Sequence, residues 1–176
     1  REFFSFHVSD AFVRELLEFW REPLAREYPD LEQRFGKPLA EVTTGMRRRG
    51  VYKTSENFDF DVTMDVQFGV NSPAAVPSTV RGPRVDKPEN PFAAPLYCRD
   101  PLDDAEGGDL DLFRVRSRHW HFDGRGDLRP EMVERFATVR YAPNSFAGWV
   151  NTQRSLHGVT PRARSTRPRR YVNFIA

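Results

Sequence analysis

The sequence predicts a mainly β protein, a β-barrel or jelly roll supported by N-terminal helices, and two observations lead to this fold class. Short apolar runs separated by turn residues recur through the second half of the chain, as in proteins built from many short strands. The first quarter instead repeats apolar residues at the three- and four-residue spacing of a helix. A length of 176 residues fits one domain, with helical support in residues 1–45 and the β core in residues 46–176.

A short strand and a helix are the first elements expected. Residues 3–8 are apolar enough for a strand, and Ser9 or Asp10 then stands where an N-cap would begin a helix. The apolar residues of that helix share one face, which must pack on another layer; they are Phe12, Val13, Leu16, Leu17, Trp20 and Leu24. Prolines punctuate the next stretch, so any helix within residues 24–35 is expected to be short or broken.

The clearest periodicity lies in residues 58–70, where every even position is apolar and every odd position is polar or glycine. A period of two predicts a long half-buried strand, or two strands in line. A loop rich in proline, serine and threonine follows it.

Shorter strands are expected in the remainder of the chain. One of them ends at residues 95–98 and precedes an acidic turn. The acidic residues of this turn lack the regular spacing of the ligands in a calcium-binding loop, which favours a solvated turn. Pro95 is unusual there, because proline removes a hydrogen-bond donor from a strand. Further strands are expected at residues 109–115, 118–122, 138–141, 145–151 and 171–175.

The charge balance disfavours a dedicated nucleic-acid binder. The 27 basic and 25 acidic residues leave a formal net charge of +2, although 24 of the basic residues are arginine. From Arg135 onward the chain has eight arginines and no acidic residue, which keeps nucleic acid or another acidic partner open as an alternative. A recognised binding motif and interleaved aromatic residues are both absent, so the sequence favours other functions.

Membrane insertion and disulfide bonding are also disfavoured. No apolar run approaches the roughly 20 residues of a membrane-spanning helix. The single cysteine, Cys98, excludes an internal disulfide and fits a reducing compartment. We therefore expect a soluble cytoplasmic protein that does not enter a membrane.

Three groups of residues then carry a resemblance. In chain order they are Arg-Gly-Pro-Arg-Val-Asp-Lys-Pro at 81–88, Glu-Gly-Gly-Asp-Leu-Asp-Leu-Phe at 106–113, and Ser-Leu-His-Gly-Val-Thr-Pro at 155–161 with Pro-Arg-Arg-Tyr-Val-Asn at 168–173. Together they resemble the iron(II)- and 2-oxoglutarate-dependent oxygenases of the prolyl-hydroxylase type. The resemblance covers roughly residues 46–176 and implies a double-stranded β-helix, which is a jelly-roll barrel like that of the cupins.

The resemblance also implies a ligand set. In that family a His-x-Asp motif and a distant histidine hold Fe(II), and an arginine after the distant histidine binds 2-oxoglutarate. Asp86 then stands in the place of the carboxylate ligand and His157 in that of the distal histidine. Arg170 stands in the place of the co-substrate arginine, with Arg169 as second choice, and Tyr97 in a position that often reaches the same carboxylate.

Substrate contacts are expected from the loop that follows the distal histidine. Arg162, Arg164 and Arg167 fall in this loop, and loops at that mouth often touch substrate in the family. The implied partner is a small-molecule or carrier-bound substrate of anionic character. A homologous partner subunit is a further possibility.

One departure from the family pattern bears on all of these roles. Arg84 stands where the family has its first histidine, and a guanidinium is donor-only, without a lone pair for a metal. Arg84 and Asp86 are two residues apart on an expected strand, so they share a face and could pair where iron would lie. The only literal His-x-Asp is His121-Phe122-Asp123, which falls after the Gly-Gly segment, so a structural role on the outward or pocket-lining side of a strand is favoured for His119 and His121. In the alternative, one of these two histidines completes an unusual ligand set with Asp86 and His157.

Four interpretations remain open at this point. The protein is a pseudo-oxygenase or partner subunit, or an active hydroxylating dioxygenase in which Asp86 and His157 hold the metal alone or with another ligand. In the third interpretation, Arg84, Arg170 and Tyr97 hold an anion without metal. In the fourth, the alignment with the family is wrong. An active enzyme would oxidise an unactivated carbon while 2-oxoglutarate becomes succinate.

Overall fold

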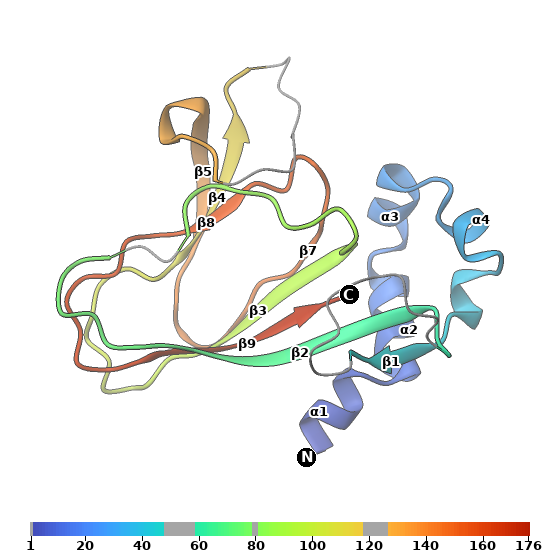
Figure 1. Cartoon of the computed structure of the whole chain (residues 1–176), viewed down its shortest axis with the longest axis horizontal. Coiled ribbons are helices and arrows are strands. Elements are labelled where there is room, and N and C mark those ends of the chain that lie inside the picture. The colour runs from blue at the N-terminus through green and yellow to red at the C-terminus, as the bar shows by residue number, and fades with distance from the viewer. Residues whose placement is uncertain (1, 48–58, 79–80, 118–126) are drawn as a thin grey trace. The chain divides into compact units, whose positions relative to one another are not determined.

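The computed structural model describes residues 2–47, 59–78, 81–117 and 127–176, which form a mainly β structure with two sheets (Figure 1). This confirms the predicted class at that level. The chain divides into two compact units, Arg1–Val66 with Phe174–Ala176, and Gln67–Asn173. The first unit contains the helices together with segments of three strands.

The first element is a helix, so the strand predicted over residues 3–8 is wrong. Helix α1 spans Glu2–His7, and His7 Nδ1 donates to the carbonyl oxygen of Phe3 at 2.6 Å, one helical turn away. The rings of Phe3 and His7 lie 4.2 Å apart, and both pack against Phe174 of the same unit. The apolar run satisfies helical spacing as well as strand alternation, and the helix brings both rings to one partner.

The helix cap at Ser9 is confirmed. Its side-chain oxygen accepts from the backbone N–H of Phe12 at 3.3 Å, and α2 spans Asp10–Phe19. The apolar stripe continues across a break at Trp20 into α3, which spans Arg21–Glu27. The short elements expected after it are α4 (Leu31–Phe35), which ends at Gly36, and the 3-10 turn η1 (Leu39–Glu41).

The long periodic segment forms strand β2, Val62–Asn71, and β1, Thr44–Met46, pairs in parallel with its first residues. Phe58 lies outside the described residues. Of the even-numbered residues, Met64 is fully buried, whereas the side chains of Phe68 and Val70 are 56% and 54% exposed. The expectation of a half-buried strand is therefore wrong at its second half, because a period of two shows which side chains share a face and not what covers that face.

The second unit contains the remaining strands except the last residues of β9. One sheet of six strands has the order β1-β2-β9-β3-β6, and β7 also pairs with β3; a three-stranded sheet has the order β5-β4-β8. The bounds in chain order are β3 Phe92–Cys98, β4 Leu110–Val115, η2 Pro130–Met132, β5 Val133–Val139, β6 Pro143–Phe146, β7 Trp149–Val150, β8 His157–Val159 and β9 Arg169–Ile175.

Most of the predicted short strands are found here. The strands predicted at 109–115, at 171–175 and up to residue 98 are confirmed as β4, β9 and β3. The one predicted at 145–151 divides into β6 and β7, and the one at 138–141 falls at the end of β5. The one predicted at 118–122 lies outside the described residues.

Pro95 is accommodated because it lies between the part of β3 that pairs with β7 and the part that pairs with β6. β3 pairs with β7 at Phe92 and Ala93 and with β6 from Leu96 onward. Pro95 itself only accepts, through its carbonyl oxygen, from the backbone N–H of Ala147 at 3.1 Å. The missing proline donor therefore falls at the junction of the two ladders.

The described helices contain no span that is both long and apolar enough to cross a bilayer. The second unit has buried clusters around Val85, Val133 and Leu156 and around Tyr97, Leu110 and Tyr141. The second cluster lies beside the candidate site.

Candidate functional site

Arg84 and His157 lie opposite each other on two antiparallel segments. The backbone N–H of each donates to the carbonyl oxygen of the other at 2.9 Å, although Arg84 belongs to no named strand. In such a pair the two side chains project from the same side of the ladder. Asp86, two residues beyond Arg84, joins them, so the structure brings together the three residues that the resemblance selected.

The carboxylate of Asp86 lies between the other two side chains. Arg84 Nε is 3.9 Å from Asp86 Oδ1, and His157 Nε2 is 3.6 Å from Asp86 Oδ2. His157 is almost wholly buried, while Arg84 and Asp86 are partly exposed. The ion pair expected from the spacing of Arg84 and Asp86 is therefore present, with a long separation.

Burial controls the charge of His157. It lowers the imidazole pKa below its ordinary value, the nearby Arg84 lowers it further, and Asp86 opposes both. Nδ1 lies 3.0 Å from the carbonyl oxygen of Ser155, which only accepts, so Nδ1 carries the proton. The neutral ring then has its lone pair at Nε2, on the side of Asp86.

The described donor set does not fit the iron centre of the resembled family. Asp86 and His157 supply two ligand types, and the third place belongs to Arg84, which offers donors only. Burial lowers the pKa of Arg84, and Asp86 is the largest influence in the opposite direction. Across the described ranges no cluster of three or more His, Cys, Asp and Glu side chains could hold a metal ion. His119 and His121 lie outside the described residues.

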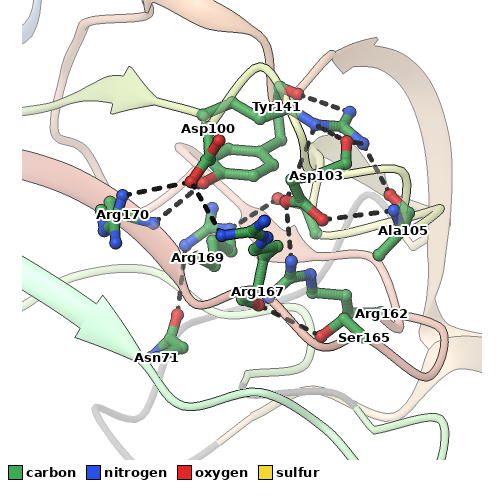
Figure 2. Close-up of polar contacts among 12 residues, drawn as sticks. Asn71, Asp100, Asp103, Ala105, Tyr141, Arg162, Ser165, Arg167, Arg169 and Arg170 are labelled. Carbon is green, nitrogen blue, oxygen red and sulfur yellow. Dashed lines mark hydrogen bonds and ion pairs between the residues drawn. The ribbon is translucent and has the colours of Figure 1, made fainter.

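Arg169 is an interior residue. Its Nε donates to the carbonyl oxygen of Gly108 at 2.9 Å. Its Nη1 donates to Asn71 Oδ1 at 3.4 Å (Figure 2). The guanidinium also lies within 5.0 Å of the ring centroids of three tyrosines, which are Tyr97, Tyr141 and Tyr171. Apart from Tyr171, which lies on β9 with Arg169, these contacts come from segments distant in sequence.

Arg170 has a different environment. Its Nη1 is 3.5 Å from Asp100 Oδ2, and its side chain is 42% exposed (Figure 2). The buried arginine of β9 is therefore Arg169, the second choice from the sequence. Alternation along a strand predicts that the two face apart, and only the packed sheet shows which one is inside.

Tyr97 is buried beside Arg169. Its ring meets that of Tyr141 edge to face, with centroids 5.3 Å apart. Burial raises the pKa of Tyr97 to about 12, so its phenol is protonated at neutral pH and can donate a hydrogen bond. The role expected of Tyr97 toward a carboxylate remains a prediction.

The arginines of the loop expected to contact substrate differ in exposure, and Arg167 is exposed. Arg162 is buried, and its Nη2 donates to Asp103 Oδ2 at 2.7 Å (Figure 2). Arg164 is exposed and remains a candidate for substrate contact. Asp103 itself is buried, so the acidic turn is solvated only in part. Nothing in the sequence distinguishes the buried Asp103 from the exposed acidic residues around it.

Trp149, Tyr141 and Tyr171 surround the candidate site and were not selected from the sequence. The Trp149 and His157 rings lie 4.6 Å apart, and Tyr171 packs with Trp149 on the buried cluster of Tyr97. No motif marks these aromatic residues, because they lie in segments far apart in the sequence.

Comparison with models of known protein families finds no match to the chain, and comparisons with curated proteins and with solved structures find none either.

Proposed function

We propose that this protein is a jelly-roll relative of the 2-oxoglutarate oxygenases in which Arg84 replaces a metal ligand, and that it acts by binding rather than by oxidation. The two-sheet, mainly β structure is compatible with a double-stranded β-helix. A cytoplasmic location and the lack of a membrane partner are part of the same proposal.

The observation that carries the proposal is the position of Arg84 beside Asp86 and His157. A guanidinium remains protonated and has no lone pair, so it cannot ligate iron. The positive charge of Arg84 also repels a divalent cation that would lie between Asp86 and His157. Asp86, 3.9 Å from Arg84, is at once the counter-ion and the carboxylate that a metal would need.

The anion-binding side of the resembled site supports a binding role. Arg169 is a buried cation beside the protonated phenol of Tyr97. An arginine fork and a phenol together suit a carboxylate, because guanidinium N–H groups and a phenol O–H can all donate to carboxylate oxygens. The ligand expected there is 2-oxoglutarate or a similar acid. We expect Arg169, rather than Arg170, to bind its carboxylate.

An active enzyme with an altered metal site is the second candidate. One observation favours it: His157 Nδ1 donates to Ser155, which leaves Nε2 available 3.6 Å from Asp86. Asp86 and His157 would then be the protein's ligands to Fe(II). The described residues supply no third ligand for that metal.

The test compares iron content and succinate formation in the wild type and Arg84→His. We expect little iron and no 2-oxoglutarate turnover in the wild type, and a gain of bound iron in Arg84→His. Arg129→His adds a histidine at an exposed position and should gain none. Stoichiometric iron with succinate production by the wild type would contradict the proposal and favour the active enzyme.

A further inference from the structure

Two buried hydrogen-bond donors beside His157 have no acceptor among the described residues. One is Nη1 of Arg84, and the other is the indole Nε1 of Trp149. Arg84 is the backbone partner of His157, and the Trp149 ring lies 4.6 Å from the imidazole. Buried donors are rarely left unpaired in proteins, so these two indicate a site for a hydrogen-bond acceptor.

The chemistry of these donors selects an anion. Neither a guanidinium nor an indole N–H can accept a hydrogen bond or ligate a cation. Asp86 lies 3.9 Å from Arg84 Nε, which leaves the Nη1 side of the guanidinium without a partner. Carboxylate oxygens can accept from both donors. The hydrogen bond from the guanidinium to a carboxylate oxygen is charge-assisted and therefore the stronger of the two.

A second cation belongs to the same surroundings. Tyr171 lies under the guanidinium of Arg169, with 4.9 Å between Cζ and the ring centroid. Tyr171 and Trp149 both pack against the buried cluster that contains Tyr97, so Arg169 and Trp149 share one aromatic neighbourhood. An anion with a negative group at each end would match this pair of cations better than a monocarboxylate.

We propose that Arg84 and Trp149 bind one carboxylate of a small dicarboxylate without any metal, while Arg169 and Tyr97 receive the other. Arg84 thereby supplies the positive charge that a metal supplies in the resembled enzymes. This inference rests on the proposed function and goes beyond it, because it gives Arg84 a binding role instead of a merely disabling one.

Calorimetric titration in a buffer that contains a metal chelator, which keeps the protein free of metal, tests the proposal. The probes are 2-oxoglutarate, glutarate and acetate, added to the wild-type protein. We expect one-site binding of the two dicarboxylates and much weaker binding of acetate. Binding of acetate as tight as that of glutarate would contradict the two-ended site.

Variants then test the residues. Arg84→Gln should weaken glutarate binding by about tenfold or more, since a charge-assisted bond is lost. Trp149→Phe retains a ring and removes only the N–H, so it should weaken binding to a smaller extent. Arg129→Gln changes an exposed arginine and should bind like the wild type. Thermal unfolding of each variant shows whether it is folded. If Arg84→Gln does not fold, the glutarate affinity of Trp149→Phe tests the site by itself.

The outcomes separate this inference from the proposed function. If dicarboxylates do not bind in chelator and the wild type holds no iron, the metal-free site is wrong while the proposed function stands. If they bind only after Fe(II) is added and succinate forms, both are wrong. Equal binding by the wild type and by folded Arg84→Gln and Trp149→Phe also overturns the metal-free site.

Discussion

Arg162 and Asp103 form a buried ion pair, with Nη2 2.7 Å from Oδ2 and side chains only 7% and 1% exposed. The contact joins the segment after β3 to the segment between β8 and β9. Arg99 reinforces it, since its Nη2 donates to the carbonyl oxygens of Asp103 and Ala105 at 2.8 Å each. The pair therefore holds together two loops far apart in sequence.

Removal of Asp103 should be strongly destabilising. Asp103→Ala leaves Arg162 buried without its counter-ion, and we expect the free energy of unfolding to fall by about 3–5 kcal/mol. Asp104→Ala, at the exposed neighbouring residue, should change it by less than about 0.5 kcal/mol. Urea unfolding measures both. Similar losses for the two variants would mean that the buried pair contributes no more than a surface residue.

Gly107 is expected to tolerate no side chain. Its φ is +79°, and an added Cβ would lie 1.9 Å from the carbonyl oxygen of Pro161. Gly36 has a φ of +69° with nothing within 4 Å of an added Cβ, so Gly36→Ala isolates the backbone strain, about 1–2 kcal/mol. Gly107→Ala should lower the unfolding free energy by clearly more. Equal urea midpoints for the two variants would contradict the close approach to Pro161.

Asp61 should make stability depend on pH in the acid range. The backbone N–H of Thr43 lowers the pKa of Asp61 most, and Lys37 and the Thr43 hydroxyl lower it further, from 3.8 to about 2. The folded state therefore favours the carboxylate. Its contribution is complete above pH 3.8 and is lost as the pH falls to about 2.

The measurement for Asp61 is the melting temperature of the wild type and Asp61→Asn across that window. The difference between them should shrink as the pH falls, because both proteins lose the other carboxylates alike. A constant difference would show that the Asp61 carboxylate has the same pKa in the folded and unfolded chains.

Met64 and Phe68 should respond differently to truncation although both are even-numbered residues of β2. Met64 is fully buried, so Met64→Ala should cost about 2–5 kcal/mol. Phe68 is 56% exposed, and Phe68→Ala should cost less than about 1 kcal/mol. Chemical unfolding of the two variants is the check, and a larger loss for Phe68→Ala would show that its face is covered.

Local patterns predicted the elements whose causes are local. The Ser9 cap, the proline breaks and strands β3, β4 and β9 follow from neighbouring residues. The N-terminal run was different, because its residues allow both a strand and a helix. The packing of Phe3 and His7 against Phe174, at the far end of the chain, accompanies the helix.

The sequence by itself determined that Arg84 cannot ligate a metal, since this follows from the chemistry of the guanidinium. It also determined that Arg169 and Arg170 face apart on a strand. The tertiary structure alone decided that Arg169 lies inside among the tyrosines, and that Asp86 lies between Arg84 and His157. The reason is physical: alternation relates neighbours on one strand, whereas the identity of the buried side depends on pairing between strands that no local pattern encodes.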